Sequence, residues 1–392
     1  MKQLLKFTLA AVLLALGSAT ATALPGRAEV AKVVGQATVA KQGGSAVSIT
    51  AGMVLGTGDT ITTGAGATVD LNLGVNGDVL RVEPDSTLEV SQLEVVNVAN
   101  RVVNTKLNVA KGGVTANVIN KLSAASKYEV RTPSGVAGIR GTIYNASVGG
   151  GMSVIHGAVS WTAAGGLSVN IFSGQRAAPG TTAVQALGTA LANTIGASVS
   201  ASTAASQPTQ AANTVNTLAQ AIATQAANAV KQGGGTDAQA AAAAATAAQQ
   251  VVNQVVAALQ AVGNTAAQSI AAGASQTIVA AAAVGAATGI AANGGSTAAA
   301  NAAAQQALTT AAQATGATVT AQNSTAILAV ATTAATTTAT AVSSGQNAFA
   351  AITSTVTTTA ATTTQTVTTS SGTGAGAATP TIVNNPLNVS AN

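Results

Sequence analysis

The chain has 392 residues and a formal net charge of +5 at pH 7, and only 6% of its residues are charged and 2% aromatic. A typical globular domain is about a quarter charged. The sequence contains no cysteine and a single histidine, His156, which excludes disulfides, thiolate metal sites and multi-histidine metal sites. The net charge is weak for this length, and no nucleic-acid partner is expected.

The first 23 residues are typical of an export signal. Two lysines precede an apolar run at residues 7–16, and Ala21-Thr22-Ala23 has the small-x-small pattern of a cleavage site. The run is shorter than the roughly 18–20 residues that cross a bilayer. We therefore predict a signal peptide at 1–23 and a periplasmic, secreted or cell-surface protein. An uncleaved anchor that extends to Ala23 is the alternative.

Residues 24–178 carry a strand-like pattern and most of the charge. Val69, Leu71 and Leu73 alternate with Asp70 and Asn72, so that one face is apolar and the other polar. Later segments repeat this period of two, and turns rich in Gly, Asn and Asp separate them. The pattern predicts an all-β domain of many short strands, arranged as a sandwich, a barrel or a short β-solenoid. The order of the strands cannot be read from the sequence.

The rest of the chain is almost uncharged. From residue 177 onward the charged residues are Lys231 and Asp237. Narrow apolar stripes at helical spacing predict alanine- and glutamine-rich α-helices over 179–330, and Asp237 stands where it could cap one of them. Threonine runs dominate 331–392, and threonine is a poor helix former, so we predict this tail to be extended or disordered.

One segment of the first part carries a specific motif. It reads Val-Arg-Thr-Pro-Ser-Gly-Val-Ala-Gly-Ile-Arg-Gly-Thr over residues 130–142, and a Gly-Asp turn lies upstream at 58–59. These segments, over roughly 29–178, resemble the FecR domain, the periplasmic module of iron-citrate-type envelope regulators. The resemblance implies a FecR-like β domain and marks eight motif positions, which we interpret as structural: Gly58, Asp59, Thr132, Pro133, Gly138, Arg140, Gly141 and Thr142.

The motif arginine has a structural interpretation. Arg140 stands between Ile139 and Gly141, so we expect a partly buried guanidinium that needs a carboxylate partner. The candidate partners are Asp59, Glu83 and Asp85. The alternative is that Arg140 binds a ligand.

The family regulators combine a cytoplasmic anti-sigma segment, one membrane span and the FecR domain. Only six residues precede the apolar run here, so no direct sigma-factor contact is expected. A link to iron regulation does not follow from the resemblance.

Catalytic signatures are missing from the sequence. His156 is expected to face solvent or a polar edge, and neither a Gly-x-Ser-x-Gly elbow nor a phosphate-binding glycine motif occurs. The acids at 78, 83 and 85 do not fit the spacing of a calcium loop. Trp161 is expected to be a packing residue. We predict no enzyme, no cofactor and no metal site.

Two noncatalytic functions remain. In the first, the protein is an envelope binding or signalling module whose strands contact a partner by edge pairing or through a groove, with the tail as a spacer. In the second, it is a surface structural or adhesin-like protein whose Ala/Thr-rich tail forms a stalk or filament and could form oligomers. The expected partner is an envelope protein or a surface polymer.

Overall fold

The computed structural model describes residues 23–118, 122–262, 265–356 and 359. The predicted signal peptide therefore lies outside the described residues, apart from Ala23. The chain divides into two compact units. The β unit comprises the residues up to Ser153 together with 158–171 and 177–184, and the helical unit comprises 154–157, 172–176 and the residues from Gln185 onward.

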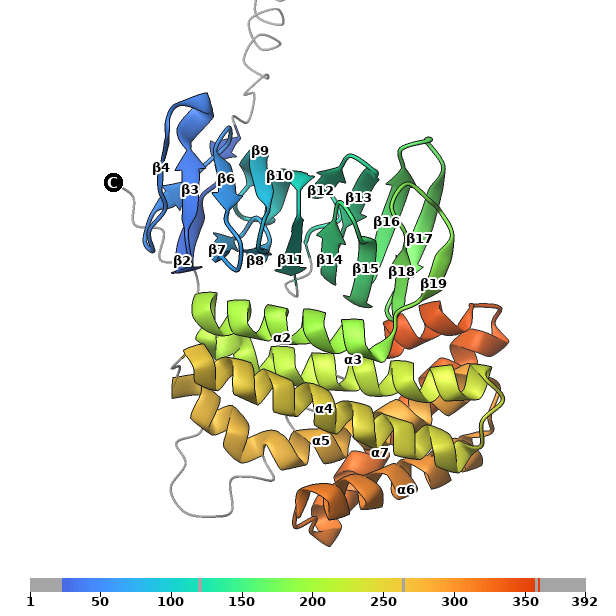
Figure 1. The fold of residues 1–392 in the computed structure, drawn as a ribbon. Helices are drawn as coiled ribbons and strands as arrows, with labels where there is room; N and C mark the ends of the chain where they lie inside the picture. Colours follow the sequence, from blue (N-terminus) through green and yellow to red (C-terminus); the bar gives the residue numbers. More distant parts are fainter. Residues whose placement is uncertain (1–22, 119–121, 263–264, 357–358, 360–392) are drawn as a thin grey trace, which may run out of the picture. The chain divides into compact units, whose positions relative to one another are not determined.

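Two sheets make up the β-rich part of the chain (Figure 1). Sheet A has ten strands, in the order β17 (Ser168–Phe172), β16 (Ala158–Ala163), β13 (Gly135–Ile139), β12 (Lys127–Thr132), β10 (Val102–Lys111), β9 (Thr87–Asn97), β6 (Thr60–Thr63), β3 (Ala37–Ala40) and β4 (Ala46–Ser48), with β1 (Leu24–Pro25) paired to β9. Sheet B has nine, in the order β19 (Val184–Ala186), β18 (Gln175–Ala177), β15 (Gly151–His156), β14 (Ile143–Ser147), β11 (Gly113–Asn117), β8 (Asp78–Val82), β7 (Thr68–Gly74), β2 (Ala28–Val34) and β5 (Val54–Leu55). A 3-10 turn, η1, covers Lys41–Gly43.

Successive parts of the chain form strands in alternate sheets. The hairpin β7–β8 belongs to sheet B and the hairpin β9–β10 to sheet A. The next strand, β11, belongs to sheet B, and the hairpin β12–β13 belongs to sheet A again. These hairpins are antiparallel, whereas β10 and β12 pair in parallel because the chain visits sheet B between them. The short strands predicted for this part are present, and their order follows the sequence closely.

The apolar faces of the strands form the core of the β unit. Tyr128 of sheet A and Tyr144 of sheet B are both buried, and the Tyr144 hydroxyl donates to that of Tyr128 at 3.4 Å. Trp161 is fully buried and donates from Nε1 to the Thr181 carbonyl at 2.9 Å. This confirms the expectation that Trp161 is a packing residue.

Helices account for most of the helical unit (Figure 1). They are α2 (Thr189–Ser206), α3 (Ala211–Gln232), α4 (Asp237–Val262), α5 (Thr265–Ala292), α6 (Thr297–Thr315) and α7 (Ala321–Ser343), with a 3-10 turn, η2 (Pro208–Gln210), before α3 and a further helical segment at 348–356. Residues Ile270–Ala292 and Ala321–Ser343 are long and apolar enough to cross a membrane by length and composition. Two thirds of the most apolar stretch of α5 is buried, as in the core helix of a folded bundle.

The same helix–turn–helix connection recurs in this unit. After α3, Gly234 adopts a φ of +79° and the N–H of Gly235 donates to the Val230 carbonyl at 2.9 Å. After α5, Gly294 has the same φ, and the N–H of Gly295 donates to the Ile290 carbonyl at 3.1 Å. This is the Schellman geometry that glycine permits at the end of a helix. The two turns lie 60 residues apart, and the turn after α7 has the same hydrogen bonds.

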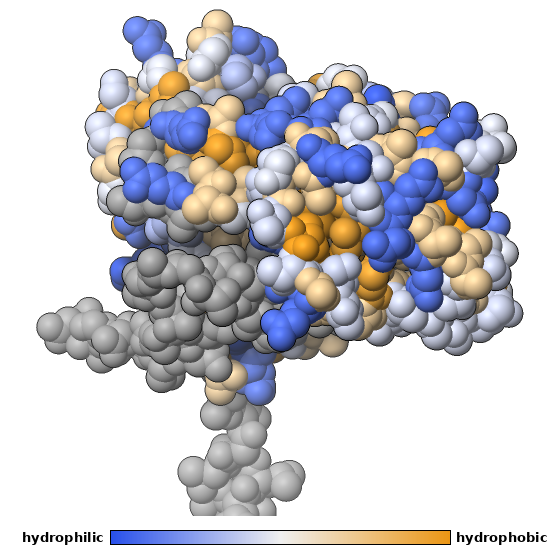
Figure 2. Space-filling view, turned by 90° about the horizontal axis from the view of Figure 1, so that it is seen from below, coloured by the Kyte–Doolittle hydropathy of each residue, from blue (hydrophilic) through white to orange (hydrophobic). Residues whose placement is uncertain are grey.

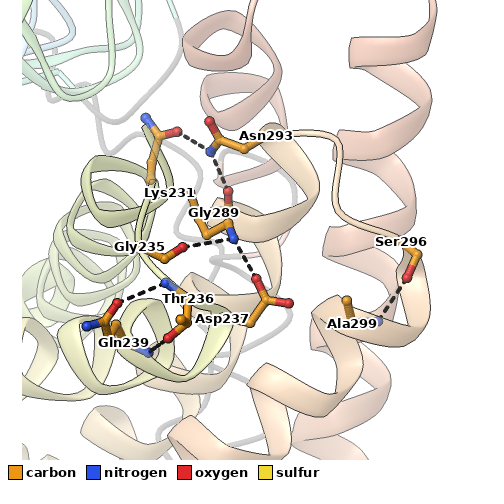
Figure 3. Close-up of polar contacts among 10 residues, drawn as sticks. Lys231, Gly235, Thr236, Asp237, Gln239, Gly289, Asn293, Ser296 and Ala299 are labelled. Atoms are coloured by element: carbon orange, nitrogen blue, oxygen red, sulfur yellow. Dashed lines mark hydrogen bonds and ion pairs between the residues drawn. The ribbon is translucent and has the colours of Figure 1, made fainter. Parts of the chain in front are cut away.

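A capping residue follows each turn (Figure 3). Thr236 accepts from the N–H of Gln239 at 3.2 Å, and Ser296 accepts from the N–H of Ala299 at 3.1 Å. Thr236, not Asp237, therefore caps α4, and Asp237 instead pairs with Lys231 at 2.8 Å. The two charged residues that follow residue 176 thus neutralise each other at one turn.

The prediction of an all-β domain followed by a partly disordered tail is wrong for this chain. The β-rich region continues into a folded set of helices, and α7 extends through the threonine-rich segment up to Ser343. Threonine is accommodated because its hydroxyls bond to backbone carbonyls four residues earlier, as Thr332 does to Leu328 at 2.8 Å. One face of α7 is also buried, at Ile327, Val330, Ala331, Ala334, Ala335 and Thr338. Most of the predicted disordered tail, from residue 360 onward, lies outside the described residues.

Candidate functional site

An open groove of about 620 Å³ lies on the outer face of sheet A, within the β unit. Four neighbouring strands, β9, β10, β12 and β13, and the turn between the last two supply its lining. The lining residues are Ser91, Lys106, Asn108, Ala110, Arg131, Thr132, Pro133 and Val136.

Strand alternation places these side chains on the accessible face. In β10, Thr105, Leu107 and Val109 are fully buried, so Lys106 and Asn108, which alternate with them, point to the other face. In β12, Val130 is buried and Arg131 points outward for the same reason. The parallel register sets Lys106 opposite Glu129 and Asn108 opposite Arg131, which brings the charged groups of two distant segments together.

The motif turn contributes Thr132 and Pro133 to the lining of the groove. Thr132 and Gly135 are paired at the end of the β12–β13 hairpin, and Pro133 and Ser134 form the turn. The Thr132 hydroxyl accepts from the N–H of Ser134 at 3.3 Å and lies 3.0 Å from its hydroxyl. A Cβ at Gly135 would lie 2.6 Å from the Trp161 ring. Only glycine therefore fits at position 135, where the hairpin packs against the Trp161 ring. This packing fixes Thr132 and Pro133 beside the groove.

The polar contacts leave a positive lining. Arg131 donates to Glu129 at 3.1 Å, and Asn108 donates to Glu89 at 3.1 Å. Both carboxylates stand on the same face but do not line the groove. Lys106 is half-buried and has no hydrogen-bond or ion-pair partner within the part of the chain that the structure describes. The lining itself has two cations, two hydroxyls and an amide, a set that suits recognition rather than acid–base or nucleophilic chemistry.

The remaining motif positions lie away from the groove. Gly58 has a φ of +90° in a turn, and Asp59 ties that turn together by accepting from Lys41 Nζ and from the N–H of Gly56, both at 2.9 Å. Gly141 also has a positive φ, +68°, and the Thr142 hydroxyl donates to the Ala158 carbonyl at 3.1 Å. At Gly138 the nearest atom to an added Cβ would be 3.7 Å away, so no steric contact requires glycine there.

The carboxylate latch expected for Arg140 is not present. Its side chain is exposed and donates to the Ala124 carbonyl at 3.1 Å, not to Asp59, Glu83 or Asp85. The buried arginine–carboxylate fork of this domain joins Arg81 to Asp70, with N–O distances of 2.6 and 2.8 Å. Asp70 is 1% exposed.

This fork could have been sought across the Asn-Gly-Asp sequence at residues 76–78, which is typical of a hairpin turn. A bulge between Asn72 and Gly74 shifts the register of the hairpin, however, and the sequence does not reveal it. The sequence motifs therefore did not predict the pairing of Asp70 with Arg81.

His156, expected at solvent or a polar edge, is buried instead, with 6% of its surface exposed. It ends β15, where residues 154–157 belong to the helical unit. Burial lowers the pKa of the imidazole to about 4, because desolvation disfavours the charged form. Nδ1 has no hydrogen-bond partner in the described structure. The histidine is remote in sequence from the lining residues and is not one of them.

The family comparison covers the whole groove. Residues 59–160 match the family model described as FecR protein, and this range contains every lining residue and seven of the eight motif positions. Comparisons with curated proteins and with solved structures each gave no match. The match confirms the resemblance seen in the sequence. FecR is a regulatory, non-enzymatic family, and the domain suggests a regulatory role associated with the cell envelope.

Proposed function

We propose that this protein, which carries a FecR domain at residues 59–160, is an exported, noncatalytic binding and signalling module of the cell envelope. Its partner would dock in the groove on the outer face of sheet A. The observation that carries the proposal is the place of the motif turn: Thr132 and Pro133 line the groove beside the two cations. A motif whose packing fixes a turn next to an accessible polar groove supports recognition at that groove.

The helical unit bears on the alternative function. A stalk or filament would need helices that extend outward, whereas α3, α4, α5 and α6 pack against one another as consecutive hairpins. This arrangement favours a folded accessory unit, and we therefore prefer the binding module to the structural protein.

Site-specific cross-linking in the native host tests the proposal. A photoreactive amino acid replaces Ser91 or Val136, which line the groove, and in the control it replaces Thr62, an exposed residue of β6 in the same sheet. We expect the full chain in the envelope fraction and one discrete adduct from Ser91 and Val136 but not from Thr62. Recovery in the cytoplasm, or the same adducts from all three positions, would contradict the proposal.

A further inference from the structure

We propose that the groove binds an extended acidic segment of a protein partner, with Lys106 and Arg131 as the recognition pair. This inference rests on the proposed function and adds the chemical class of the partner. Its starting point is Lys106, which is half-buried among the lining residues and has no anionic partner in the described structure. An ammonium that lacks an ion-pair partner can donate a charge-assisted hydrogen bond to an incoming carboxylate.

Arg131 provides the second contact. Half of its side chain is exposed, and one terminal nitrogen, Nη2, donates to Glu129. A guanidinium carries five N–H donors in a planar fork, so donors remain for a carboxylate from solution. The two carboxylates nearby, Glu129 and Glu89, already accept hydrogen bonds from Arg131 and Asn108. They would repel an acidic segment that is out of register, which adds selectivity.

The spacing of the two cations suits an extended chain. Lys106 is opposite Glu129 in the parallel register, and Arg131 is two residues further along β12. With strands about 4.8 Å apart and a rise of about 3.3 Å per residue, such diagonal neighbours are roughly 8 Å apart. In an extended peptide, side chains on the same side recur about every 6.6–6.8 Å. Acidic residues at alternate positions would therefore meet Lys106 and Arg131 together.

The other lining residues favour a peptide over a sugar polymer. Ser91, Asn108 and Thr132 offer hydroxyl and amide groups for a peptide backbone, and Pro133 and Val136 offer small apolar contacts. The lining contains no aromatic ring on which a sugar could stack.

The test uses the full chain and fluorescence anisotropy with a labelled peptide of alternating glutamate and serine. We expect saturable binding that weakens with salt, and no binding of the matched peptide with glutamine in place of glutamate. Lys106→Gln and Arg131→Gln should each weaken binding about tenfold, the loss of one charge-assisted hydrogen bond. The control is Lys127→Gln, which removes the same charge from an exposed position on β12 outside the lining. It should change the dissociation constant less than about twofold.

Three results would overturn the inference. The first is an equal loss of affinity in Lys127→Gln, which would indicate diffuse attraction to a basic surface. The second is equal binding of the glutamine peptide. The third is binding of polygalacturonate or inorganic phosphate without binding of the peptide. If Ser91 and Val136 cross-link a partner in cells while the acidic peptide fails to bind, the docking site stands and the acidic class is wrong. If cross-linking fails as well, the proposed function also fails.

Discussion

The buried histidine makes the stability of this protein depend on pH in a way that one substitution can isolate. In the folded chain the pKa of His156 is lowered to about 4, and burial is the cause. In the unfolded chain it returns to about 6.5. The unfolded state therefore binds the proton more readily, so the contribution to stability is complete above pH 6.5 and is lost as the pH falls toward 4.

The size of the effect follows from these two pKa values. Between pH 7.5 and pH 4.5 the linkage amounts to about 2.5 kcal/mol of unfolding free energy, with a steepest slope of about 1.2 kcal/mol per pH unit. His156→Gln removes the titrating group but keeps a neutral polar side chain. Subtracting the unfolding free energy of the variant from that of the wild type at each pH cancels the contribution of the other ionisable groups.

Urea unfolding followed by the fluorescence of Trp161 provides the assay, because Trp161 is the only tryptophan and is fully buried. We expect the wild type to lose about 2.5 kcal/mol relative to His156→Gln across this range. An NMR titration gives an independent check, since the chain has one imidazole signal. A constant difference between the two proteins, or a histidine resonance that titrates near 6.5, would refute the reasoning.

Two further predictions compare matched substitutions. Arg81→Met leaves the buried carboxylate of Asp70 without its partner and should lower the free energy of unfolding, measured in urea, by about 3 kcal/mol. Arg140→Met removes one exposed contact and should lower it by less than about 0.5 kcal/mol. Similar losses in the two variants would contradict the pairing of Arg81 with Asp70. In α5, Gly273→Ala faces open space and should raise the stability by about 0.5–1 kcal/mol. Gly285→Ala would place a methyl group 2.6 Å from the Cβ of Ala223 and should lower the melting temperature; a gain in both variants would mean that α3 and α5 do not pack at this distance.

The first half of the chain shows where sequence patterns suffice. Alternation at Val69, Leu71 and Leu73 predicts β7, because apolar residues at every second position lie on one face only in a β-strand. The groove could not be predicted from the sequence, since Lys106 and Arg131 are 25 residues apart and come together through the parallel pairing of β10 and β12. That pairing arises because the chain forms a strand of sheet B between β10 and β12, and local periodicity does not indicate this.

His156 and the threonine-rich helix were predicted wrongly for related reasons. The alternation of β15 does not show which face is covered, and all six of its residues are buried. The helix propensity of threonine underestimated the length of α7, because propensity does not include the burial of side chains in the folded protein. In α7 a row of side chains from Ile327 to Thr338 is buried. In both cases packing from distant parts of the chain decided the outcome, and a single sequence contains no direct sign of it.

A small number of glycine and capping residues determine how the helices of the helical unit are arranged. Helix contacts made by alanine bury little area per residue, so these helices gain stability by approaching one another closely. Gly289 lies against Ala227, and a Cβ added at Gly289 would lie 2.6 Å from the Cβ of Ala227. Close approach requires helices of defined length and phase. The glycine turns and the caps at Thr236 and Ser296 supply this, because each ends one helix and starts the next in the same geometry. A composition that resembles a low-complexity tail can therefore fold, provided that its rare glycines and caps recur at the spacing of the hairpins.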